Sequence, residues 1–221
     1  MDVWEEEKYP WLVDEKRFIK KAVIELGVPY LGLCLGHQLL AEAIGGEVGK
    51  SKKPEIGVLS VNLTEIGSQG IFFDGVDEEF KCLQWHGAEV TRLPHDAEVL
   101  ASSSDCVVQS LKWRTRAYSI QFHLEVEENT VQNWGSIPSY AEALSSMMGP
   151  QGLKRLDMDC KKEMSNLFLV LAGAWDKNNP SAISEKEFNL IKRIKSVQYL
   201  GNVKDVRKIW KKSHIAILLS K

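Results

Sequence analysis

The chain has 221 residues, of which 44% are hydrophobic and 26% charged, and its formal net charge at pH 7 is −2. These values are typical of a soluble globular protein with one large or two small domains. The near-neutral charge does not favour nucleic-acid or membrane binding, and no apolar run approaches the roughly 18 residues of a membrane span. Four widely spaced cysteines, without a CxxC pair or metal-ligand spacing, indicate a reducing cytoplasm. We expect no metal and no other cofactor.

The first 26 residues are expected to form a loop and then a helix. Residues 1–9 have no clear hydrophobic period, whereas residues 10–26 place apolar side chains near one helix face. The side chains on that face are Trp11, Phe18, Ala22 and Leu26. Gly27 is expected to end the helix. A parallel α/β sheet normally opens with a strand, so this order suggests that the chain begins partway into a domain.

A strand-to-helix turn around Cys34 is the central feature of the sequence. Residues 28–33 are expected to form a buried strand and residues 38–44 a helix that Gly45 ends. A cysteine at the tip of such an elbow is typical of a nucleophile, because the helix N-terminus favours the thiolate. The N–H of Leu35 would then stabilise an oxyanion. The alternative is a structural cysteine beside a tight turn.

Short strands dominate the middle of the chain and helices follow them. A Gly- and Lys-rich loop is expected over residues 45–54, and a turn-rich segment over residues 67–79. Strands are expected at residues 56–63, 80–86, 98–102, 106–111 and 117–123. Helices are then expected at residues 129–134, 138–148 and 152–166.

A cysteine nucleophile needs a base, and the base needs a partner that orients it. Of the five histidines, His123 is the best candidate because it ends a predicted strand. Glu125 follows two residues later, on the same face of an extended chain. By itself this pattern is more typical of a surface, but beside an elbow cysteine it favours a catalytic pair. We expect His37 to face away from the elbow or to pack locally, and His95 to lie in a solvated turn. His214 belongs to the far C-terminal segment.

Three segments resemble class I glutamine amidotransferases. Residues 32–38, Gly-Leu-Cys-Leu-Gly-His-Gln, match the G-x-C-x-G-x-Q elbow of that family. Residues 122–125 are similar to its F-H-P-E motif, and residues 84–87 to its W/S-H-G segment. The segments occur in family order, and the resemblance covers residues 1–166, closest to the stand-alone, GMP-synthase-like members. It implies an α/β, flavodoxin-like fold with a mostly parallel sheet and flanking helices.

The resemblance implies that the protein hydrolyses the side-chain amide of glutamine through a cysteinyl thioester. Cys34 would attack the amide, His123 would act as base and then as acid, and Glu125 would orient His123. The residues implied to hold glutamine or line its pocket are Gly32, Leu35, Gln38, Trp85 and His86. For the Trp85 side chain, a core position is an equally open interpretation. The implied ammonia acceptor, a synthetase partner, is not identified by the sequence.

Two departures from the family pattern bear on activity. Leu124 stands where the family has proline, which should bend the His-Glu geometry only slightly. The family's first strands, and the Gly-Gly-Pro loop that supplies a second oxyanion donor, would precede Met1. Loss of one such donor typically lowers turnover about a hundredfold, and a missing central strand exposes an unpaired edge. We therefore expect an N-terminally incomplete sheet, poor activity and a tendency to aggregate.

The last segment, residues 167–221, does not fit the family. It is expected to contain strands at residues 168–173, 197–200 and 215–219, with helices from Ser184 and Asp205. It resembles part of the C-terminal domain of GT-B glycosyltransferases of the GT4 kind, which implies a partial Rossmann-like segment. The acidic sugar-nucleotide motif of those enzymes is missing, so transferase activity is not expected. A divergent amidotransferase tail is the alternative.

The sequence therefore predicts a glutaminase domain at residues 1–166 followed by an incomplete α/β segment. Two other functions stay open at this point. One is a related cysteine hydrolase that acts on another γ-glutamyl compound, and the other is an inactive, truncated and fused amidotransferase-like protein.

Overall fold

The computed structural model describes residues 1–164 and, beyond them, residues 169–172, 186, 189–190, 193, 197–201 and 215–218. The chain forms two compact units. The first comprises Met1–Gly67 and Glu78–His123, and the second comprises Ser68–Asp77 and Leu124–Lys221. In the part of the chain that is described, no helix has both the length and the apolar character needed to cross a membrane.

The first unit is built on a sheet of six strands, counted over the described residues, in the order β1-β6-β5-β4-β2-β3. The strands are β1 (Tyr30–Leu33), β2 (Glu47–Leu63), β3 (Glu79–Arg92), β4 (Ala97–Ser102), β5 (Ser110–Trp113) and β6 (Ala117–Ile120). Strands β1 and β6 run parallel, whereas the other neighbours are antiparallel. The α/β class is confirmed, and the sheet is mixed rather than mostly parallel. Short connections explain the β4–β5 and β5–β6 pairs, because strands joined by a few residues can pair only antiparallel.

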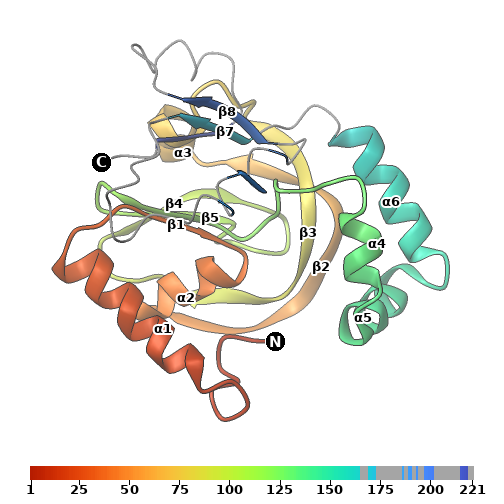
Figure 1. Ribbon diagram of the computed structural model, residues 1–221, viewed down its shortest axis with the longest axis horizontal. Coiled ribbons are helices and arrows are strands. Elements are labelled where there is room, and N and C mark those ends of the chain that lie inside the picture. The colour runs from red at the N-terminus through yellow and green to blue at the C-terminus, as the bar shows by residue number, and fades with distance from the viewer. Residues whose placement is uncertain are drawn as a thin grey trace. The chain divides into compact units, whose positions relative to one another are not determined.

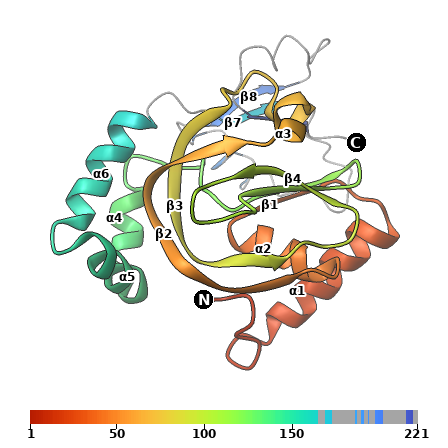
Figure 2. The ribbon, with the colours of Figure 1, turned by 180° about the vertical axis from the view of Figure 1, so that it is seen from behind.

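Strands β2 and β3 are much longer than their neighbours and bend around β4 and β1 (Figure 2). Glu47 already pairs with Arg92, so the loop predicted over residues 45–54 is wrong for most of its length. The Gly- and Lys-rich composition had suggested a loop, but cross-strand pairing with β3 overrides that local preference. The curl returns β3 to the segment that follows β6, where the His123 N–H donates to the Leu83 carbonyl at 2.8 Å.

The segment before β5 also differs from the prediction. A strand was expected from residue 106, but β5 begins only at Ser110. Residues 103–106 form a turn in which the Ser103 N–H donates to the Cys106 carbonyl at 2.8 Å. The ladder between β4 and β5 has a register shift near this point. Cys106 and Val108 are buried without strand pairing, whereas Val107 is exposed.

Helix α1 (Trp11–Lys20) continues into a π-helical turn at Lys21–Glu25, and α2 (Leu35–Ala43) packs beside α1 (Figure 1). The predicted helix and its end at Gly27, where φ is +62°, are confirmed. Its predicted apolar face is wrong by one position, because Leu12 and Ile19 are buried whereas Phe18 is 69% exposed. The two buried side chains lie seven residues apart, two helical turns along one stripe, and enter the core cluster that α2 also joins.

Strand β1 is confirmed over Tyr30–Leu33, but only Gly32 in it is buried. The prediction of a buried strand is therefore wrong for most of the segment, and Val28 is exposed. The reason is position, because β1 is at one end of the strand order and pairs with β6 alone among the described residues. An end strand keeps one edge and part of its faces uncovered.

The second unit contains the three predicted helices and a parallel sheet of three strands among its described residues. The helices are α4 (Thr130–Gly135), α5 (Pro138–Met148) and α6 (Gly152–Glu163), and the strands are β7 (Leu169–Ala172), β8 (Val197–Gly201) and β9 (Ile215–Leu218). The predicted strands near residues 168, 197 and 215 are confirmed. Of the helix predicted from Ser184, residues 186, 189 and 190 are described and are helical. The helix predicted from Asp205 lies outside the described residues, and the domain boundary at residue 166 stays a prediction.

Candidate active site

Cys34 lies at the tip of a strained turn between β1 and α2. Its backbone has φ 48° and ψ −102°, a conformation that L-residues rarely adopt. Three hydrogen bonds hold it there. The Cys34 N–H donates to the Ile120 carbonyl at 2.9 Å, and the Cys34 carbonyl accepts from the N–H groups of His37 and Gln38 at 3.0 and 3.2 Å. The predicted elbow is therefore present, with the half-buried Cys34 at its apex.

Gly32 makes this turn possible by close packing. A Cβ atom at Gly32 would lie 2.4 Å from the Gly36 carbonyl oxygen, so no side chain fits there. The same carbonyl accepts a hydrogen bond of 3.0 Å from the Tyr30 hydroxyl. A Cβ atom at Gly36, in contrast, would meet only the Tyr30 hydroxyl at an ordinary 3.5 Å. The close approach of two backbone segments explains the glycine at position 32.

The sheet brings Cys34 and His123 to the same edge. In the parallel pair of β1 and β6, Leu33 is opposite Ile120. Cys34 follows β1 by one residue and His123 follows β6 by three, and neighbouring strands are about 4.8 Å apart. His123 is nearly buried. The Glu125 carboxylate accepts a hydrogen bond of 2.9 Å from the Leu124 N–H within the second unit, and its pairing with His123 stays a prediction.

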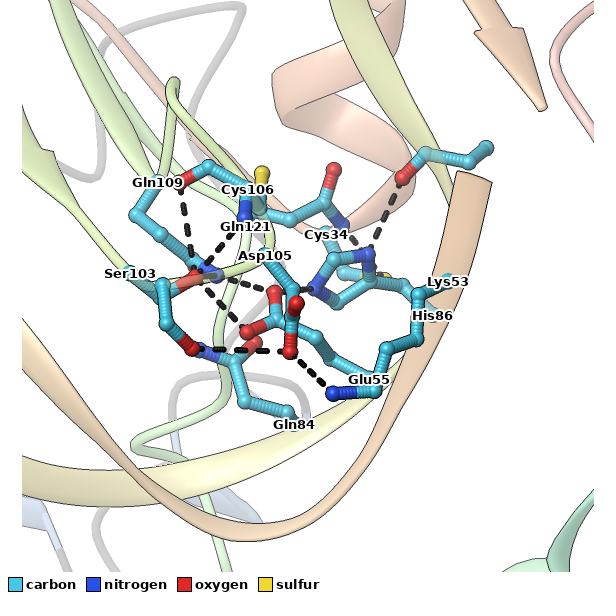
Figure 3. A network of polar contacts seen from close by, with 12 residues as sticks. Cys34, Lys53, Glu55, Gln84, His86, Ser103, Asp105, Cys106, Gln109 and Gln121 are labelled. Carbon is cyan, nitrogen blue, oxygen red and sulfur yellow. Dashed lines mark hydrogen bonds and ion pairs between the residues drawn. The ribbon is translucent and has the colours of Figure 1, made fainter. Parts of the chain in front are cut away.

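The buried side-chain amide of Gln121 contacts the sulfur of Cys34. Its Nε2 donates to Cys34 Sγ at 3.6 Å (Figure 3). A second buried amide, that of Gln38, donates through Nε2 to Gln121 Oε1 at 3.1 Å. Gln38 was predicted to hold glutamine, and its amide nitrogen is directed at Gln121. Gln121 was missed, although it precedes His123 by two residues and therefore shares its face of an extended chain. That spacing was the available signal.

His37 is completely buried, and its Nδ1 lies 2.8 Å from the Ser119 hydroxyl. Of the two expectations for His37, local packing is the one that this contact supports. Burial, reinforced by the nearby His86, lowers the pKa of His37 to about 3, so the ring is neutral at pH 7. The side chain of His95 is almost fully exposed, next to Asp96, as predicted. His214 lies outside the described residues.

A second polar cluster joins β2 to β3 around Glu55, which is 2% exposed (Figure 3). Its carboxylate accepts from the Ser103 hydroxyl at 2.6 Å and from Gln109 Nε2 at 2.7 Å. His86 Nε2 lies 3.2 Å from the carboxylate, at ion-pair distance, and His86 Nδ1 lies 3.0 Å from the Ala88 carbonyl. Glu55 was missed from the sequence because a loop was expected up to residue 54, just before the strand register that places Glu55 opposite His86.

The predicted pocket residues Trp85 and His86 are both buried in β3. For Trp85 this agrees with the core alternative, and the His86 ring faces Glu55. Leu35 begins α2 directly after Cys34, so its N–H belongs to the first turn, where helical N–H groups have no helical acceptor. Contact of these residues with glutamine stays a prediction.

The four cysteines differ in accessibility, and Cys34 alone among them is not buried. Burial raises the pKa of the Cys106 and Cys160 thiols to about 12, and that of Cys82 above its usual value. A buried, protonated thiol is a poor nucleophile. Within the described residues, no group of three or more His, Cys, Asp or Glu side chains has a metal-binding arrangement.

Comparison with known proteins identifies the family of this chain. The family model described as Glutamine amidotransferase class-I matches residues 7–133, more than half of the chain. The chain belongs to the class I glutamine amidotransferase family. The resemblance of residues 167–221 to glycosyltransferases stays a prediction.

Two curated relatives of this amidotransferase domain are GMP synthases. The chain is 38% identical over 177 residues to the glutamine-hydrolyzing GMP synthase of Aeropyrum pernix, covering 74% of this chain and 32% of that protein. It is 38% identical over 116 residues to a glutamine-hydrolyzing GMP synthase subunit from Sulfolobus acidocaldarius, covering 52% of this chain and 60% of that protein. The chain thus spans less than two thirds of either relative.

Solved structures support the fold. The crystal structure of a glutamine amidotransferase from Thermotoga maritima matches with a TM-score of 0.63 at 30% identity, over 75% of this chain and 68% of that one. A glutamine amidotransferase from Methylobacillus flagellatus matches with a TM-score of 0.57 at 30% identity, over 63% and 54% of the two chains. The predicted amidotransferase fold class, an α/β sheet with flanking helices, is confirmed.

Proposed function

We propose that this protein hydrolyses the side-chain amide of glutamine to glutamate and ammonia, with Cys34 as nucleophile. The observation that carries the proposal is the strained backbone of Cys34, at the same sheet edge as His123. Strain of this kind costs about 1–3 kcal/mol and persists where the surrounding structure enforces it, most often at functional sites. Membership of the amidotransferase family gives the substrate class.

In the proposed reaction, His123 accepts the Cys34 thiol proton as Sγ attacks the amide carbon of glutamine. The tetrahedral oxyanion accepts a hydrogen bond from the Leu35 N–H. His123 then gives its proton to the leaving nitrogen, which departs as ammonia and leaves a γ-glutamyl thioester. Water, deprotonated by His123, attacks the thioester, releases glutamate and restores the thiol. Glu125 orients the His123 ring and stabilises its charged form.

The ammonia is proposed to serve a synthetase partner. Several relatives are named as one subunit of a glutamine-hydrolyzing GMP synthase, and the name of the Aeropyrum pernix protein couples GMP synthesis to glutamine hydrolysis. We infer an ammonia-consuming synthetase as the partner class.

The test measures glutamate released from L-glutamine by the full chain, together with labelling by a chloroketone analogue of glutamine. We expect turnover and labelling that Cys34→Ala abolishes, whereas Cys160→Ala, which removes a buried thiol of the second unit, keeps both. Failure of the folded chain to hydrolyse glutamine would overturn the proposal. Turnover only with another γ-glutamyl amide in a substrate panel would transfer the same chemistry to a different substrate.

A further inference from the structure

The side-chain amide of Gln121 lies between the reactive sulfur and a second amide. Its Nε2 donates to Cys34 Sγ at 3.6 Å, and its Oε1 accepts from Gln38 Nε2 at 3.1 Å. Gln121 is completely buried and Gln38 nearly so. A reversed Gln121 amide would place two NH₂ groups face to face and a carbonyl oxygen against the sulfur. The donor from Gln38 therefore fixes which end of Gln121 meets Cys34.

Both amides are anchored in the elements that make the elbow. The Gln121 N–H donates to the Gln109 carbonyl at 2.8 Å, one residue after β6. The N–H of Gln38, in the first turn of α2, donates to the Cys34 carbonyl at 3.2 Å. The line of contacts from Gln38 through Gln121 to the sulfur thus has little freedom, because each backbone is hydrogen-bonded and each side chain is buried.

We propose that Gln121 is a positioning residue that holds the Cys34 sulfur in its thiolate form, and that Gln38 keeps Gln121 in the donating orientation. An N–H donor binds S⁻ more strongly than the neutral thiol, because hydrogen bonds to charged acceptors are the stronger ones. Gln38 then acts on the sulfur through Gln121. The inference rests on the proposed function for its role in turnover, but not for its effect on the thiol.

The matched control for Gln121 is Gln84. Gln84 is also completely buried, and its Nε2 donates to the sulfur of another cysteine, Cys82, at 3.9 Å. Replacing either glutamine by methionine keeps a similar length and removes one amide donor to a sulfur. Of these two glutamines, Gln121 alone contacts the sulfur of Cys34.

The experiment follows alkylation of the full chain by iodoacetamide from pH 5 to pH 10, with modification of Cys34 read by peptide mass spectrometry. For Gln121→Met we expect the midpoint of the rate profile to move up by about one pH unit, so that alkylation at pH 7 slows about tenfold. For Gln84→Met the Cys34 profile should stay that of the native chain. The reagent does not resemble glutamine, so substrate binding cannot cause the difference.

Two further variants keep the test decisive if Gln121→Met fails to fold. Gln121→Glu retains an acceptor for Gln38 but puts a carboxylate against the sulfur, and should move the midpoint up by more than one unit. Gln38→Met leaves Gln121 in place but releases its orientation, and should move the midpoint in the same direction by less. With glutamine, Gln38→Met should lower kcat more than it raises KM.

An unchanged Cys34 profile in the folded Gln121 variants would overturn the inference, as would an equal shift in Gln84→Met. The outcome is separable from that of the proposed function. If the native chain hydrolyses glutamine but Gln121→Met leaves alkylation unchanged, the proposed function stands and the positioning role is refuted. If the native chain has no glutaminase activity but the Cys34 profile still moves in Gln121→Met, the positioning role stands and the proposed function is refuted.

Discussion

Cys34 and Glu55 are polar residues set into the same curled sheet, yet the chain holds them in opposite ways. Cys34 has a strained backbone and a half-buried sulfur. Glu55 is 2% exposed and lies where β2 resumes regular pairing with β3 after a register shift. Its carboxylate faces Ser103, Gln109 and His86. Strain kept at one residue indicates function, whereas a buried polar network such as the one around Glu55 helps to specify a core. A substitution at Cys34 should therefore mainly lower activity, whereas a substitution at Glu55 should mainly lower stability.

The largest expected effect is on turnover at Cys34. Cys34→Gly should lower glutamine hydrolysis by at least about a thousandfold, because the nucleophile is gone. It should also raise the free energy of unfolding by about 1 kcal/mol, since glycine adopts φ 48° without strain. Urea unfolding and a glutamate assay measure the two quantities. A variant that loses activity and stability together would remove the contrast with Glu55.

Glu55 should show the reverse pattern. Glu55→Gln leaves the buried donors around it with a neutral, partly mismatched partner, and should lower the free energy of unfolding by about 3 kcal/mol. Glu47→Gln in the same strand is the control, because Glu47 is exposed and its 3.0 Å ion pair with Arg92 is worth less than about 1 kcal/mol. Equal urea midpoints for the two variants would show that the buried network does not stabilise the sheet.

Gly32 and Gly36 test how the elbow is held. Gly32→Ala would bring a Cβ within 2.4 Å of the Gly36 carbonyl oxygen and should lower the free energy of unfolding by about 2 kcal/mol. Gly36 lies inside α2, and a Cβ there would meet only the Tyr30 hydroxyl at an ordinary distance. Gly36→Ala should therefore be neutral or slightly stabilising. Thermal unfolding of both variants measures this. A Gly32→Ala variant as stable as the native chain would mean that the turn can widen without lowering the free energy of unfolding.

The elbow was predictable because its signal is local. A strand pattern, a cysteine between two glycines and a helix pattern lie within residues 28–44, and the turn is fixed by neighbours in the sequence. The role of Glu55 was not predictable, because it depends on a β2–β3 register set by residues some 30 positions away. The helix face at Leu12 was missed for a similar reason. Periodicity alone does not decide which of two adjacent stripes of the helix is buried. Packing against α2 and its neighbours decides it.

A further effect appears only when the pH changes. It concerns His37, whose neighbours are Ser119 and His86. Its pKa is lowered to about 3 in the folded chain and is about 6.5 when unfolded. Below pH 6.5 the unfolded ring takes up a proton that the folded ring does not. The free energy of unfolding is therefore highest above about pH 6.5 and falls as the pH is lowered towards 3. Between pH 7 and pH 5 the native chain should lose about 2 kcal/mol from this group.

The measurement for His37 is the free energy of unfolding in urea at pH 7, 6 and 5. His37→Asn keeps a polar group near the Ser119 hydroxyl but cannot take up the proton, so the native chain should lose about 2 kcal/mol more than this variant between pH 7 and pH 5. His95→Asn, at an exposed ring, should follow the native curve. Parallel curves for the native chain and His37→Asn would show that the ring is charged in the folded state. The interior around His37 would then tolerate a charge that its burial argues against.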